Sequence, residues 1–226
     1  MIAPDDTGLL AIDTSSSILR LAVRFGDDRL VKSSEEVERA HGQMIMRKVS
    51  NLFASSGMQP IDLSGIIVCT GPGSFTGLRV GIAVAKGMAV ALDIPVVGVS
   101  LFEIAALRLQ NSPEEVRVLI FQRKGEYLVA RINDGQLDLA DVTTMTVPEI
   151  VSQAGQNRFA SIGPVEPALS EQAGVQLSAI EFDASDFLSV GEPRLASGGD
   201  NLDTLEPLYF GKSQAEIRFD QRHKNI

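Results

Sequence analysis

The sequence contains no tryptophan, one cysteine and two histidines in 226 residues. A single cysteine, Cys69, excludes an intramolecular disulfide and fits a reducing compartment. The histidines, His41 and His223, are too far apart in the sequence for a paired-histidine metal site at helical spacing. Aromatic residues amount to 5% and all hydrophobic residues to 44%, so the core must consist mainly of Val, Ile, Leu and Ala.

An excess of positive charge is also missing, because the net charge is −9. Residues 109–226 carry 10 basic and 18 acidic side chains, a net charge of −8, whereas residues 1–108 carry −1. Proteins that hold a phosphate backbone by themselves usually present a basic patch, so we expect any nucleic-acid contact to be indirect. The first eight residues lack a basic region and a long apolar run, and the apolar segment 77–92 contains Arg79 and Lys86. We therefore expect a cytoplasmic protein without membrane association.

The order of apolar segments and turns predicts an α/β fold with mixed sheets and helices on both faces. Strands are predicted at 9–13, 18–25, 30–33, 66–70 and 95–99, and helices at 41–56, 74–92 and 100–109. After a linker at 111–113, a second hairpin is predicted at 116–122 and 126–132, followed by shorter segments at 148–154, 158–162 and 187–195. Because each half begins with a hairpin, we expect two related subdomains, 1–110 and 111–210, and a flexible tail, 211–226.

A glycine-rich turn between a strand and a helix, Gly71-Pro-Gly-Ser-Phe-Thr-Gly77, is the most distinctive segment. Such a turn presents backbone N–H groups at a helix N-terminus, where anions bind. The hydroxyl-rich hairpin turn Asp13-Thr-Ser-Ser-Ser17 can also bind phosphate. The candidate nucleotide-binding residues for ATP or ADP are Asp13, Thr14, Ser15, Gly71 and Gly73. Tight packing of strand and helix explains the same glycines, and the turn lacks the Gly-Lys-Ser/Thr ending of a P-loop.

Four small residues recur at four-residue spacing along the predicted helix 74–92: Gly77, Gly81, Ala85 and Ala89. They form a smooth stripe that a second helix could approach closely, from the same domain or from another chain. Catalytic groups are harder to find. Cys69 lies in an apolar strand, where a thiol pairing with His41 is disfavoured, and Ser74 is not in a Gly-x-Ser-x-Gly elbow. The residues therefore predict no intrinsic catalysis.

Five segments together resemble the TsaB (YeaZ) family: 11–16, 41–43, 71–81, 85–87 and 94–100. This resemblance implies an actin-like ATPase superfamily fold built from two RNase-H-like subdomains. It also implies a role in forming threonylcarbamoyladenosine beside the tRNA anticodon. The transferase of that system is a paralogue, TsaD, whose two metal-binding histidines correspond to Leu101 and Ala105 here. The resemblance thus implies a non-catalytic scaffold with no metal and no cofactor. Phe121-Gln122 departs from the family, which commonly has Asp-Ala there.

The partners implied by the resemblance are a TsaD-type transferase and a TsaE-type ATPase, with a homodimer when the transferase is absent and only indirect contact with tRNA. The candidate docking residues, expected at or beneath the docking surface, are Ile45, Leu52, Gly77, Gly81, Ala85 and Ala89. We expect Gly81→Leu to leave the fold largely intact and to abolish association. Two alternatives remain open: a weak ATPase that uses Asp13, Thr14 and Ser15, and a glycoprotease-like peptidase.

Overall fold

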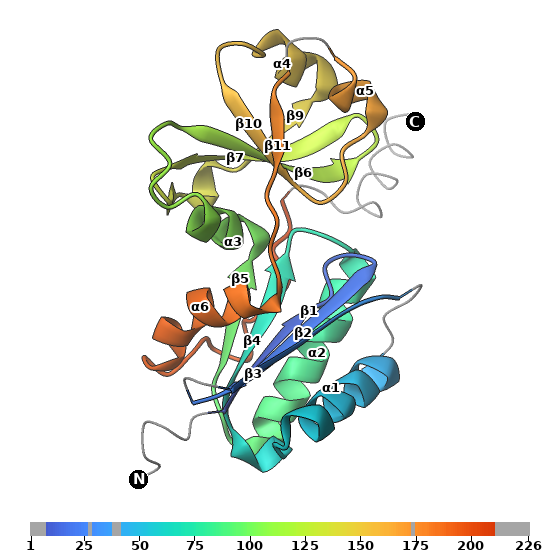
Figure 1. Cartoon of the computed structure of the whole chain (residues 1–226), viewed down its shortest axis with the longest axis vertical. Coiled ribbons are helices and arrows are strands. Elements are labelled where there is room, and N and C mark those ends of the chain that lie inside the picture. The colour runs from blue at the N-terminus through green and yellow to red at the C-terminus, as the bar shows by residue number, and fades with distance from the viewer. Residues whose placement is uncertain (1–7, 27–28, 38–41, 173–174, 211–226) are drawn as a thin grey trace, which may run out of the picture.

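The computed structural model describes residues 8–26, 29–37, 42–172 and 175–210. It contains two β-sheets that follow one another along the long axis of the molecule (Figure 1). Helices pack around both sheets, so the predicted α/β class is confirmed. His41 and the predicted tail, 211–226, lie outside the described residues.

The first sheet has five strands in the order β3-β2-β1-β4-β5. Their bounds are β1 (Gly8–Asp13), β2 (Ile18–Phe25), β3 (Arg29–Glu36), β4 (Leu63–Gly71) and β5 (Val96–Ser100). The pairs β1–β2 and β2–β3 are antiparallel, whereas β1–β4 and β4–β5 are parallel. Because side chains alternate along a strand, Leu10 and Ile12 of β1 face one layer of helices and Leu9 and Ala11 face the other.

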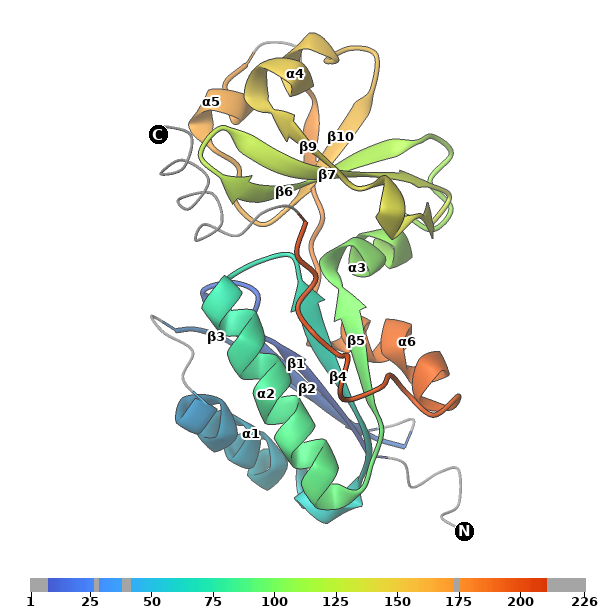
Figure 2. The ribbon, with the colours of Figure 1, turned by 180° about the vertical axis from the view of Figure 1, so that it is seen from behind.

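Helices α1 (Gly42–Ser56) and α2 (Phe75–Leu92) cover one face of the first sheet (Figure 2). Helix α1 buries Ile45, Val49, Leu52 and Phe53, the spacing of one helical face. Helix α2 begins after Ser74, whose side chain accepts a hydrogen bond from the Gly77 N–H. The short 3₁₀ helix η2 (Pro60–Asp62) leads from α1 into β4.

The second sheet repeats the topology of the first. Its strands are β6 (Val116–Arg123), β7 (Glu126–Asn133), β8 (Gln136–Leu137), β9 (Thr143–Thr146), β10 (Arg158–Ile162) and β11 (Leu177–Ala179). The order β9-β7-β6-β10-β11 carries two antiparallel pairs and then two parallel pairs, as in the first sheet, and β8 also pairs with β7. Helices α4 (Val147–Ser152) and α5 (Pro167–Ser170) cover its outer face, and the 3₁₀ helix η3 (Leu139–Asp141) lies before β9.

Helix α6 (Ala184–Leu195) corrects the predicted subdomain boundary. Although it follows the second sheet in the chain, it packs against β1, β4 and β5 of the first sheet (Figure 1). Its Phe187 and Leu188 join the buried cluster that contains Leu9 and Ile67. The range 111–210 is therefore not one subdomain, because the apolar second face of the first sheet is covered by a helix from the far end of the chain.

Helix α3 (Leu101–Arg108) lies where the two halves meet and contacts both β5 and β7. Buried side chains from both sheets form one continuous cluster around it, including Val97 and Val99 of β5 and Val118 of β6. The two halves thus share a hydrophobic core.

Candidate functional site

Two turns at the carboxyl ends of the first-sheet strands bind each other directly. The Ser74 N–H donates to the Ser15 carbonyl at 2.7 Å, and the Thr14 hydroxyl donates to the Gly77 carbonyl at 2.8 Å. A Cβ at position 73 would lie 2.3 Å from the Ser15 carbonyl oxygen. These glycines therefore permit close packing between the two turns, which is the structural alternative that the spacing had left open.

The Asp13 carboxylate is fully buried and forms an ion pair within the chain. Its Oδ1 accepts a hydrogen bond from the Ser15 N–H at 2.9 Å, and its Oδ2 accepts one from Arg20 at 3.0 Å. The Arg20 guanidinium in turn lies 4.5 Å from the centre of the Phe182 ring. Since Asp13 and Arg20 face each other in the β1–β2 register, the hairpin itself sets this ion pair. Arg20 was not among the predicted site residues, because the strand register that pairs it with Asp13 is known only from the structure.

Several polar groups of the candidate nucleotide site bind other parts of the chain. They are the Asp13 carboxylate, the Thr14 hydroxyl and the N–H groups of Ser15 and Ser74. A ligand that used these groups would have to break buried hydrogen bonds, each costly to leave unmade. Within the described ranges, no group of three or more His, Cys, Asp or Glu side chains could hold a metal ion.

Cys69 lies in β4 and is buried. Burial raises the pKa of its thiol well above the usual value, and the nearby Asp13 carboxylate raises it further. A protonated thiol is a poor nucleophile. Leu101 and Ala105 of α3, at the positions of the metal-binding histidines in the resembled paralogue, are buried apolar residues. These surroundings give Cys69 and α3 a packing role.

The predicted docking residues all lie beneath the surface. Ile45, Leu52, Ala85 and Ala89 are buried, as are Gly77 and Gly81. A Cβ at position 81 would lie 2.2 Å from the Thr14 hydroxyl oxygen. The expectation that Gly81→Leu leaves the fold intact is therefore wrong, because a leucine there would displace the turn that holds Asp13.

The opposite face of α2 is also apolar, and it is exposed or half-buried. We call this surface the α2 outer face; it comprises Val80, Ala83, Val84, Gly87, Val90 and Ala91, and Gly42 of α1 lies near Val80 and Val84. Val90 is 70% exposed. By length and composition α2 is the one helix in the described ranges that could cross a membrane, with a mean hydropathy of 1.5. It packs on the first sheet instead, so this helix combines a core face with an apolar outer face.

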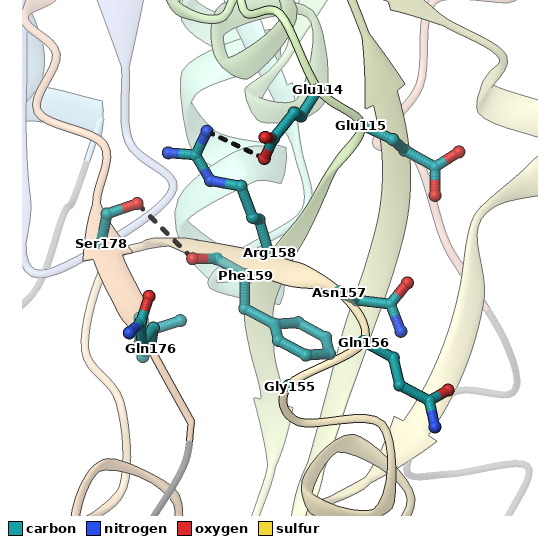
Figure 3. Close-up of a pocket in the computed structure, with 10 residues that line it drawn as sticks. Glu114, Glu115, Gly155, Gln156, Asn157, Arg158, Phe159, Gln176 and Ser178 are labelled. Carbon is teal, nitrogen blue, oxygen red and sulfur yellow. Dashed lines mark hydrogen bonds and ion pairs between the residues drawn. The ribbon is translucent and has the colours of Figure 1, made fainter.

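Two of the cavities in the described part of the chain are large. The larger, about 880 Å³, opens at the amino ends of β6, β10 and β11, where Arg158 contacts Glu114 at 3.5 Å (Figure 3). Ligands of open α/β sheets bind at the carboxyl ends of strands, so its position does not suit a substrate site. The second cavity, about 690 Å³, lies at the carboxyl ends of β4 and β5, and its Arg194 already binds Asp200 and Glu103 at 2.9 and 3.2 Å.

Comparisons of the sequence and the structure with known proteins all point to the same family. The family model for tRNA N6-adenosine threonylcarbamoyltransferase (TsaD) matches residues 33–192. The chain is 29% identical to the tRNA threonylcarbamoyladenosine biosynthesis protein TsaB of Escherichia coli, over 92% of this chain and 96% of that protein. It is 35% identical to TsaB of Bacillus subtilis, over about half of each chain (52%). The solved structure of YeaZ from Pseudomonas aeruginosa is similar, with 26% identity, a TM-score of 0.70, and 90% of this chain and 100% of that one covered.

Two RNase-H-like subdomains with the same strand order, joined through a shared core, define an actin-like ATPase fold. This confirms the predicted fold class. The sequence and structural similarities are more specific than the fold, and they confirm the predicted family. The chain belongs to the TsaB (YeaZ) family.

Proposed function

We propose that this chain is a non-catalytic subunit in the biosynthesis of threonylcarbamoyladenosine on tRNA. Its part is to bind and stabilise a TsaD-type transferase, and a TsaE-type ATPase completes the assembly. The names of its relatives in Escherichia coli and Bacillus subtilis support the process. The buried thiol of Cys69 and the internally bound Asp13 support a role without catalysis.

The α2 outer face is the observation that carries this proposal. Val80, Ala83, Val84 and Gly87 follow the three- and four-residue spacing of one helical side, and Val90 continues it. Contiguous exposed apolar surface is typical of protein interaction sites. Small side chains in particular allow another helix to approach closely. The proposed docking surface is therefore the exposed side of α2, one of the two helices that the family resemblance implied, and the predicted residues are buried beneath it.

When the transferase is absent, a second copy of this chain covers the α2 outer face in a symmetric dimer. The net charge of −9 supports indirect contact with tRNA, because phosphate contacts need basic side chains. We expect no nucleotide to bind to the chain alone, since its candidate phosphate ligands are engaged within the protein. Calorimetry with ATP and Mg²⁺ distinguishes this proposal from the weak-ATPase alternative.

The test compares two exposed aliphatic residues of the first sheet and its helices. Val90→Glu places a charge on the α2 outer face, whereas Leu30→Glu places one on β3. Leu30 is 43% exposed and alternates with Val31, which packs on the side of α1 and α2, so Leu30 faces the other side of the sheet. We expect Val90→Glu to weaken binding to the cognate TsaD-type protein at least about tenfold in calorimetry, and Leu30→Glu to bind like the parent.

Threonylcarbamoyladenosine formation in a reconstituted mixture gives the second readout. Omitting this chain should abolish the product, and Val90→Glu should reduce it when the chain is limiting. A parent chain that does not bind the transferase, or a full yield of product without it, would overturn the proposed function.

A further inference from the structure

An arginine that contacts two neighbouring aromatic rings lies in the first turns of α2. The Arg79 guanidinium carbon is 3.9 Å from the centre of the Phe75 ring and 5.9 Å from that of Tyr209. The Arg79 Nε donates a hydrogen bond to the Tyr209 hydroxyl at 2.9 Å, and the two rings are 5.4 Å apart. Phe75 and Tyr209 are each 46% exposed. We call these three residues the Arg79 cluster.

Tyr209 lies on the segment 205–210, which has no regular secondary structure and runs from the region of α6 toward the second sheet (Figure 2). The Leu208 N–H donates to the Thr70 carbonyl at 2.8 Å, which ties the segment to β4. The Gln122 side chain donates to the Phe210 carbonyl at 2.8 Å, which ties it to β6. Tyr209 is therefore fixed on both sides along the backbone while its ring remains half-exposed.

The outer donors of Arg79 have no partner in the described part of the chain. Its Nε is used by Tyr209, whereas no hydrogen bond or ion pair there involves Nη1 or Nη2. Stacking and the Nε hydrogen bond hold the guanidinium plane in one orientation. A guanidinium fork fixed in this way matches a carboxylate bidentately and loses little side-chain entropy on binding.

The Arg79 cluster continues the α2 outer face. Arg79 precedes Val80 and lies one helical turn before Ala83, so the aromatic cluster and the apolar face form one surface along the helix. Arginine and tyrosine are enriched among the residues that dominate binding energy at protein interfaces. A protein carboxylate suits this site better than an RNA phosphate, because the surrounding surface is apolar and the chain carries a net charge of −9.

We propose that the Arg79 cluster binds an Asp or Glu side chain of the TsaD-type partner and anchors one end of the docking surface. This inference rests on the proposed function. The carboxylate accepts hydrogen bonds from Nη1 and Nη2 of Arg79, and apolar side chains beside it pack on Phe75 and Tyr209. The anchor fixes the register of the partner along α2, since the apolar face alone offers no directional contact.

The test measures affinity for the cognate TsaD-type protein by calorimetry. Arg79→Lys keeps the charge but loses the fork and the stacking, and we expect it to weaken binding at least about tenfold. Tyr209→Phe removes only the hydroxyl that orients Nε, and we expect a loss of about threefold. The matched control is Arg29→Lys, because Arg29 also stacks on an aromatic ring, that of Phe25 at 4.5 Å, but does so at the β2–β3 hairpin. It should bind like the parent.

An alanine scan of partner Asp and Glu residues then identifies the bound carboxylate. One partner variant should weaken the parent complex and have no further effect on the Arg79→Lys complex. If the parent binds and Arg79→Lys binds equally well, the anchor is refuted while the proposed function stands. If Arg79→Lys instead weakens binding to tRNA alone, the site is an RNA contact and the inference is wrong. A parent that does not bind the partner overturns both proposals.

Discussion

Two glycines of α2, Gly81 and Gly87, differ in the space around them, and replacing each by alanine tests this difference. A Cβ at Gly81 would meet the Thr14 hydroxyl oxygen at 2.2 Å, whereas a Cβ at Gly87 has nothing within 4 Å. We expect Gly81→Ala to lower the free energy of unfolding by about 1–3 kcal/mol through overpacking. Gly87→Ala should raise it by up to about 1 kcal/mol, because alanine favours a helix. Urea unfolding of both variants measures the difference. Equal stabilities would contradict the contact between α2 and the turn that contains Thr14.

The residue types in the two turns could be predicted to matter, but their partners could not. The sequence marked the turn 71–77 and Asp13 as unusual, and the structure brings both turns together. What the spacing could not give is the direction of each side chain. The small residues at 77, 81, 85 and 89 suit contact with a sheet or with a second chain equally well, and only the position of β1 decides which.

At the scale of elements, helix α6 depends on an acidic cap that also pairs with the first sheet. Asp183 accepts hydrogen bonds at the start of α6 and forms an ion pair with Lys32 of β3 at 2.6 Å. Burial raises the pKa of Asp183, but hydrogen bonds from Lys32 and Ser185 outweigh it, and the pKa falls from 3.8 to about 2. The ionised cap therefore contributes stability that is complete above about pH 4 and is lost as the pH falls toward about 2.

Asp183→Asn should remove the ion pair and keep a good cap. Because Lys32 and Asp183 are 44% and 36% exposed, we expect a loss of less than about 1 kcal/mol at pH 7. The difference between parent and variant should shrink as the pH is lowered from 4 to 3, measured by urea unfolding. In a Lys32→Gln background the substitution should have a smaller effect. A difference that is constant with pH would refute the role of the charge.

The longer elements could be predicted because their apolar periodicity is strong. Strands β1 and β2 and helices α1 and α2 agree with the predicted segments to within one or two residues. Among the short elements, the segment predicted at 158–162 agrees with β10, but β9 and α5 were not predicted. Strand β9 contains a single strongly apolar residue, Met145, and α5 has four residues. These elements form because the rest of the second sheet offers them an edge or an apolar face, which local sequence does not reveal.

At the scale of the whole molecule, the first 110 residues should not form a stable unit. Without α6, Leu9, Ala11 and Ile67 would expose their face of the first sheet to water. We expect a fragment of residues 1–110 to aggregate or to lack cooperative thermal unfolding, whereas the full chain unfolds in one transition. Circular dichroism and calorimetry of both chains test this. A soluble fragment with a sharp transition would restore the boundary that the sequence predicted.

The duplication could be anticipated from two hairpin-led halves, but the boundary between them could not. The contact between α6 and the first sheet joins residues more than 100 positions apart, for example Gly191 and Ile67. No periodicity within α6 distinguishes one sheet from the other as its partner. Tertiary packing alone assigns it.

The return of α6 to the first sheet also sets an order of events during translation. The last strand of the first sheet ends at residue 100, but the second face of the sheet is covered only after α6, which ends at residue 195, has been synthesised. At about 5–20 residues per second, the ribosome takes at least several seconds to synthesise that interval. During this time the first sheet exposes an apolar face to which chaperones can bind, so this half can finish folding only after α6 has been synthesised.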